Sequence, residues 1–132
     1  MDTRYTINTR RLLDAGVENW SYCCYERAVY QLGSLSRFNS RQANDELRAA
    51  IRAYLAAFEP SFNEADRPDQ ATTDQLYAWA HIAWDRSDNA HRAGDWELEE
   101  ALSSKGSKLM AIARRRHAPN EVCNSCGRNE TN

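Results

Sequence analysis

The sequence predicts an all-α protein, a single-domain bundle of four to five helices with a polar C-terminal tail. Apolar residues recur at helical spacing in four segments, and no stretch shows the apolar–polar alternation of a half-buried strand. With 132 residues, 42% of them hydrophobic, the chain is long enough for one domain with its own core. We therefore expect the helical domain to span residues 1–118 and the tail to span residues 119–132.

The first helical pattern begins after Asn8 or Thr9 and stops near Gly33, where Ser and Asn supply turn chemistry. Further apolar residues beside its main stripe predict that this helix packs on more than one neighbour. Cys24 is expected in the core, and Cys23 is rotated by about 100° from it. The predicted buried stripe consists of Leu13, Val17, Trp20, Cys24 and Ala28.

The second helix should start at Asn39 or Ser40, which can cap it, and end before Pro60. Residues 59–72 then form a linker that is long for a helix connection, so it is either draped over the surface or functional. The apolar face of this second helix is Ala43, Leu47, Ala50, Ile51, Tyr54, Leu55 and Phe58.

The third helix is predicted from Thr73 to Ala93, because Thr72 and Gln75 match a capping box and Gly94 is a stop signal. Its apolar face is Leu76, Trp79, Ala80, Ala83, Trp84 and Ala90.

Asp95 is the expected N-cap of a fourth helix that ends in "RRRH". Gly106 costs about 1 kcal/mol relative to Ala inside a helix, so the weak "SSKGSK" centre predicts a kink or break there. The residues expected to be buried are Trp96 or Leu98, with Leu102, Leu109, Ile112 and Ala113.

Charge is distributed unevenly along the chain. Residues 59–102 carry eleven acidic and three basic side chains, although the whole chain has a net charge of only −2. Such an acidic block bears on surface potential and partners rather than on fold. No apolar run has the length of a membrane span and no signal-peptide pattern is seen, so we expect a cytoplasmic protein with reduced thiols.

Linear motifs of the common enzyme classes, such as G-x-S-x-G, the P-loop and H-E-x-x-H, do not occur. His81, Asp85, Asp88 and Arg92 share one face of the third helix, where they could hold a divalent metal or perform acid–base chemistry. That face lies opposite the apolar stripe, which favours an ordinary solvated surface. A small helical enzyme using His81, Asp85 and Asp88 is therefore an alternative, and His91 is expected to pack or cap.

The tail contains Cys123 and Cys126 in "VCNSCG", which resembles the knuckle of zinc ribbons. This is half a site, and His117 with Cys23 or Cys24, or a second subunit, would have to complete it. A mobile reduced tail or an adventitious disulfide is the competing interpretation. A zinc-stabilised regulator that contacts nucleic acid through the basic C-terminal end is thus a second alternative.

The favoured hypothesis is a non-catalytic protein-binding module or inhibitor whose acidic, aromatic-bearing surface at about 59–100 docks on a basic surface of a larger protein or nucleoprotein. Phages and plasmids use small acidic helical proteins of this kind against host defence machinery, as anti-CRISPR inhibitors do, although no motif of such a family is present. The candidate partner-binding residues are Glu64, Asp66, Asp69, Asp74, Asp85, Asp88, Trp96, Glu97, Glu99 and Glu100.

Overall fold

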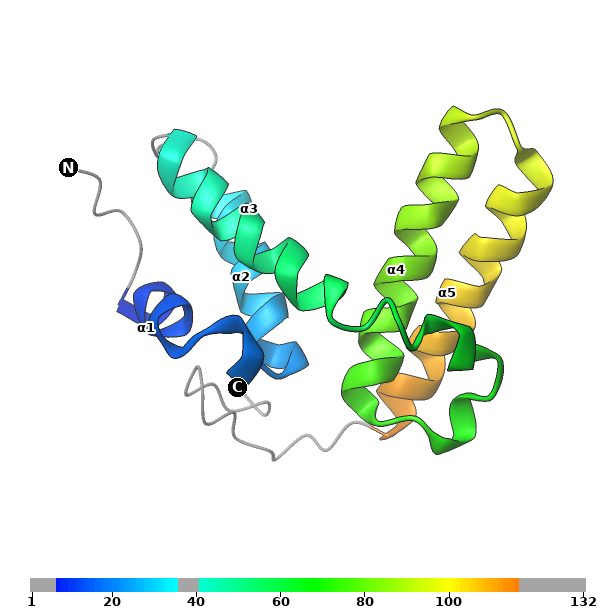
Figure 1. The fold of residues 1–132 in the computed structure, drawn as a ribbon, viewed down its shortest axis with the longest axis horizontal. Helices are drawn as coiled ribbons and strands as arrows, with labels where there is room; N and C mark the ends of the chain where they lie inside the picture. Colours follow the sequence, from blue (N-terminus) through cyan, green and yellow to red (C-terminus); the bar gives the residue numbers. More distant parts are fainter. Residues whose placement is uncertain (1–6, 36–40, 117–132) are drawn as a thin grey trace. The chain divides into compact units, whose positions relative to one another are not determined.

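A computed structural model describes residues 7–35 and 41–116, and within these ranges all regular structure is helical (Figure 1). This confirms the predicted all-α class. No helix in these ranges is both long and apolar enough to cross a membrane. The α-helices are α1 (Ile7–Ala15), α2 (Tyr22–Leu35), α3 (Arg41–Ala56), α4 (Thr73–Arg92) and α5 (Trp96–Arg116), and the 3-10 helices are η1 (Val17–Asn19), η2 (Phe62–Asp66) and η3 (Pro68–Gln70).

The described chain divides into two compact units, one that ends at Ala56 and one that begins at Ala57. The first unit contains α1 to α3, and the second contains η2, η3, α4 and α5. The extension of a single domain over residues 1–118 stays a prediction.

In the first unit, α2 contacts both α1 and α3. The core of the first unit contains a group of aromatic rings in contact. The ring centroids of Tyr22 and Tyr25 lie 5.5 Å apart, and those of Tyr25 and Tyr54 lie 5.4 Å apart. The centroid of Trp20 lies 6.1 Å from that of Tyr54. Offset rings at these distances bury large areas and add attraction between their quadrupoles.

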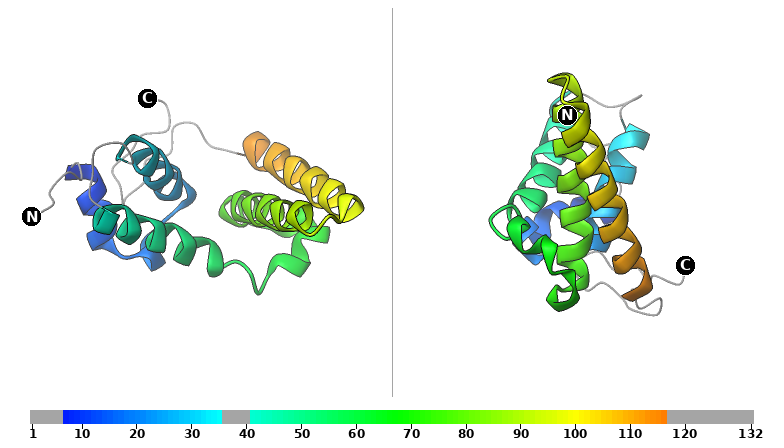
Figure 2. Two further views of the ribbon diagram at one scale, coloured as in Figure 1. Left: turned by 90° about the horizontal axis from the view of Figure 1, so that it is seen from above. Right: turned by 90° about the vertical axis from the view of Figure 1, so that its right-hand side faces the viewer.

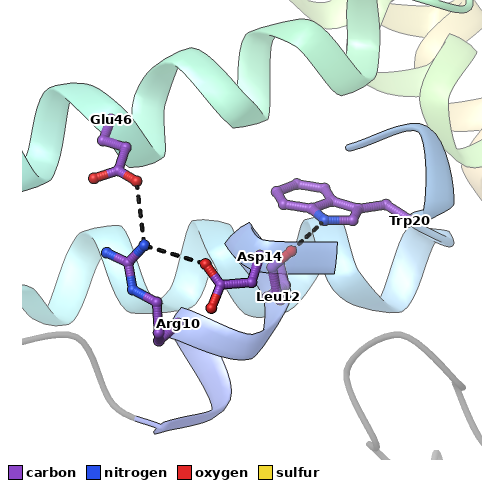
Figure 3. Close-up of polar contacts among 5 residues, drawn as sticks. All are labelled: Arg10, Leu12, Asp14, Trp20 and Glu46. Atoms are coloured by element: carbon purple, nitrogen blue, oxygen red, sulfur yellow. Dashed lines mark hydrogen bonds and ion pairs between the residues drawn. The ribbon is translucent and has the colours of Figure 1, made fainter. Parts of the chain in front are cut away.

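The helical conformation is interrupted between α1 and α2, so the prediction of one helix from Asn8 or Thr9 to Gly33 was wrong. Gly16 has φ 87°, a left-handed conformation that glycine adopts at little cost and that ends α1. Trp20 Nε1 then donates a 2.9 Å hydrogen bond to the Leu12 carbonyl (Figure 3). The break changes the helical phase, so Leu12 is fully buried and Leu13 is partly exposed.

Cysteine burial follows from the two neighbours of α2. Cys24 is fully buried, as predicted, and Cys23 is also buried despite its rotation of about 100°. A residue on either side of α2 can be covered because α1 and α3 both pack on this helix.

An exposed charge network joins α1 to α3. Arg10 Nη1 lies 3.5 Å from Asp14 Oδ1 and 3.6 Å from Glu46 Oε1 (Figure 3). All three side chains are well exposed, so the network contributes little to stability in water.

In the second unit, α4 and α5 lie side by side as an antiparallel hairpin (Figures 1 and 2). The predicted capping box is present, since Gln75 N donates to Thr72 Oγ1 at 3.1 Å and Thr72 N to Gln75 Oε1 at 2.9 Å. Gly94 turns the chain with φ 76°, and Asp95 caps α5 by accepting a 3.2 Å bond from Leu98 N. These local signals explain why the bounds of both helices were predictable.

Gly106 does not interrupt α5, so the predicted break is absent. A Cβ atom at this position would lie 2.5 Å from Nε1 of Trp84 on α4. The glycine therefore gives the indole room to pack directly against α5, and the packing offsets its poor helix propensity.

The segment of residues 61–71, which contains η2 and η3 and is called the strap below, is draped over the hairpin. Phe62 and Ala65 are buried, and Trp79 Nε1 donates a 3.1 Å bond to Ser61 Oγ. The guanidinium of Arg86 lies 4.4 Å from the centroid of the Phe62 ring, and the ammonium of Lys105 lies 4.8 Å from it. One aromatic ring thus connects the strap to both helices.

Arg116 holds the far end of the strap. Its guanidinium donates to the carbonyl oxygens of Ala71 at 2.7 Å, Asp69 at 3.1 Å and Pro68 at 3.4 Å. These bonds engage one of the arginines in the basic run at the end of α5.

Candidate functional site

The tip of the hairpin presents large apolar side chains to solvent. Trp96 is 62% exposed and Leu98 is 48% exposed, so the prediction that one of them is buried was wrong. Ser87 Oγ of α4 donates a 2.8 Å bond to the Glu99 carbonyl of α5, one residue after Leu98. We call residues Trp96, Glu97, Leu98, Glu99 and Glu100 the tip surface.

His91, near the end of α4, positions part of the tip surface. Its Nδ1 lies 3.0 Å from Glu99 Oε2, and its ring centroid lies 5.3 Å from that of Trp96 in an edge-on arrangement. His91 is itself 61% exposed, so its contacts with Glu99 and Trp96 lie at the surface. The contact orients the indole while most of its surface stays accessible.

A shallow hollow of about 450 Å³ lies beside Trp96. Glu99 and Glu100 contribute carboxylates to its lining, and Ser103 and Ser104 contribute hydroxyl groups. Sequence reasoning missed both serines. Their spacing from Glu100 was the available signal, because residues three and four positions apart are neighbours on a helix surface.

A second hollow, of about 550 Å³, lies on the strap and collects three of the predicted residues, Glu64, Asp66 and Asp69. Its negative charge is partly compensated, because Asp66 pairs with Lys105 at 2.9 Å and Arg67 also lines it. No large apolar side chain is part of this lining.

The remaining predicted residues lie on α4. Asp74 is in the first helical turn and half-buried, while Asp85 and Asp88 are exposed. The structure thus brings Glu64, Asp66 and Asp69 together in one hollow, and Trp96, Glu99 and Glu100 together in another.

Most of the predicted carboxylates form no ion pair within the part of the chain that the structure describes. Asp66 and Glu99 have the basic partners already described. Six others make no ion pair with any residue in the described ranges, namely Glu64, Asp69, Asp85, Asp88, Glu97 and Glu100.

His81 is half-buried, and its ring lies 5.4 Å from that of Trp84 in an edge-on arrangement. Burial lowers the pKa of His81, because the charged imidazolium loses hydration. Within residues 7–35 and 41–116, no group of three or more His, Cys, Asp or Glu side chains is arranged to hold a metal ion. The predicted zinc ligands His117, Cys123 and Cys126 lie outside these ranges.

The first unit also exposes Val29 and Tyr30, on α2. Glu26 and Arg27, three residues before them, carry opposite charges. The surface around Val29 and Tyr30 therefore has no net charge of one sign that would select a charged partner. The tip surface differs because its three charged side chains are all glutamates.

The chain matches no protein-family model, no curated protein and no solved structure.

Proposed function

We propose that the protein is a non-catalytic binding module that docks through its tip surface on a basic surface of a larger protein or nucleoprotein. The observation that carries the proposal is the exposure of Trp96, 62%, and Leu98, 48%, among three glutamates. Exposed apolar surface that is rimmed by polar residues marks interaction sites on proteins.

The two kinds of side chain have different roles in this proposal. Trp96 supplies affinity, since buried aromatic anchors carry most of the binding energy at protein interfaces. Glu97 and Glu100, which make no ion pair with a described residue, attract a basic partner over distances of about one Debye length, about 8 Å at physiological salt.

An inhibitor that covers the nucleic-acid-binding surface of a defence complex, as anti-CRISPR proteins do, is one form that such a module takes. In this proposal the protein works in the cytoplasm, where the partner is also found. The enzyme alternative ranks lower because His81 packs edge-on against Trp84 while Asp85 and Asp88 are exposed.

The test is affinity capture from the source cell with matched charge variants of the full chain. Glu97→Gln/Glu100→Gln and Glu64→Gln/Asp69→Asn each remove two carboxylates that make no ion pair with a described residue. We expect the tip variant to lose the captured partner and the strap variant to retain it. Trp96→Ala should lose the partner without a change in net charge.

Equal loss of the partner in both charge variants would show general electrostatic attraction rather than docking at the tip. Capture that is unchanged in Glu97→Gln/Glu100→Gln and in Trp96→Ala would contradict the proposal. Circular dichroism and a denaturant midpoint for each variant provide the control for folding.

A further inference from the structure

The hollow beside Trp96 has the lining of a site for one particular side chain. Trp96 and Glu100 are four residues apart on α5, and Ser103 and Ser104 follow after three and four more, so all four positions project to the same side of the helix. An aromatic ring, a carboxylate and two hydroxyl groups are therefore presented together.

The availability of the two carboxylates differs. Glu99 Oε2 is 3.0 Å from His91 Nδ1, whereas Glu100 makes no ion pair with a described residue. Glu100 is thus the carboxylate that can accept hydrogen bonds from a ligand, and His91 keeps the Trp96 ring beside it.

We propose that this hollow binds an arginine side chain of the basic protein partner. The inference depends on the proposed function and names the group that the tip surface recognises. A guanidinium stacks on an aromatic face and donates paired hydrogen bonds to one carboxylate, which matches Trp96 with Glu100. Lysine offers a compact charge without the planar donor pair, so it fits this lining less well.

The positive end of the α5 helix dipole repels a cation at the tip, but only weakly. A helix N-terminus is equivalent to roughly half a positive charge. Three glutamates occupy the opening turns of α5, at positions 97, 99 and 100. Their charge exceeds that of the dipole even when Glu99 is shared with His91, so the tip remains attractive to a guanidinium.

The test is a titration of the full chain with three blocked tripeptides, Gly-Arg-Gly, Gly-Lys-Gly and Gly-citrulline-Gly, followed by nuclear magnetic resonance. We expect the arginine peptide at millimolar concentration to shift the Trp96 indole N–H signal and the amides of Ser103 and Ser104. The lysine peptide should bind at least about threefold more weakly, and the citrulline peptide should cause no shift.

Glu100→Gln and Glu97→Gln are the matched pair, because both remove one charge from the tip but only Glu100 lines the hollow. Glu100→Gln should weaken the arginine peptide by about fivefold and Glu97→Gln by less than about twofold. Trp96→Ala, followed through the Ser103 and Ser104 amides, should weaken it by about two- to fivefold.

Two results separate failure of this inference from failure of the proposed function. If arginine and lysine peptides bind equally well, or if neither shifts the Trp96 signal, the arginine site is overturned even when partner capture still depends on the tip. If the tip variants capture the partner as well as the unchanged protein does, the proposed function is contradicted, whatever the peptides show. Retained selectivity for arginine that is lost in Glu100→Gln supports the site.

Discussion

The two ends of the α4–α5 hairpin use the same kinds of residue in opposite ways. At the end covered by the strap, Trp79 is 1% exposed and its Nε1 donates to Ser61, while Arg116 donates to strap carbonyls. At the other end, Trp96 is largely exposed and Glu100 makes no ion pair with a described residue. At the strap end, a tryptophan and a charged side chain stabilise the fold. At the tip, another tryptophan and another charged side chain stay accessible to a partner.

The residue type alone therefore does not determine whether a side chain of this hairpin is buried in the fold or exposed to solvent. The strap provides the second surface that a side chain needs in order to be buried. The tip has only the short turn between Arg92 and Trp96, which is too small to cover an indole.

The largest expected effect is on Trp79. Trp79→Ala should lower the free energy of unfolding by about 3–5 kcal/mol, because it removes a fully packed ring and its bond to Ser61. Trp96→Ala should change it by less than about 0.5 kcal/mol. Urea denaturation of both variants measures the contrast, and equal destabilisation would show that the tip is also structural.

A smaller effect is expected at the middle of the hairpin. Gly106→Ala should destabilise the protein by about 1–2 kcal/mol, because its Cβ would collide with the Trp84 indole. Helix propensity alone predicts stabilisation of about 1 kcal/mol, so the sign of the change decides between packing and propensity. Ser107→Ala, at the adjacent exposed position, is the control and should be close to neutral or slightly stabilising.

The strap should be loosened by Arg116→Met. We expect the loss of the three hydrogen bonds to carbonyl oxygens to cost about 1–2 kcal/mol, measured as faster amide hydrogen exchange in the strap. Arg115→Met removes the same charge from an exposed neighbour. If the two variants exchange at the same rate, the bonds made by Arg116 do not hold the strap.

The smallest effect concerns pH. Burial lowers the pKa of His81 in the folded state, so the unfolded state binds the proton more readily. Stability should therefore fall as the pH drops below about 6.5, the usual pKa of histidine. His81→Gln should show less of this loss between pH 7.5 and 5 in thermal denaturation, whereas an identical pH dependence would mean that other groups cause it.

Much of the second unit could be predicted because its signals are local. The capping box at Thr72 and the N-cap at Asp95 satisfy backbone donors within a few residues, so the sequence alone determines where α4 and α5 begin. The break at Gly16 was missed because a glycine inside an apolar pattern is compatible with both a continuous and a broken helix.

Burial was predicted less well wherever it depends on a partner element. Cys23 is covered because α2 has two neighbours, and Gly106 fits because Trp84 packs against it. The acidic residues of the tip surface and the strap were identified from charge alone. The sequence could not predict that these acidic residues line two separate hollows, because the charge pattern does not determine how the strap packs on the hairpin.

The short turn between α4 and α5 also bears on the order of folding. Helices joined by so few residues meet at little cost in loop-closure entropy, so the tip can form early. The strap contacts close much larger loops, since Asp66 and Lys105 are 39 residues apart and Ala71 and Arg116 are 45 apart. The strap is therefore expected to be the last part of this unit to dock and the first to detach when the protein is unfolded.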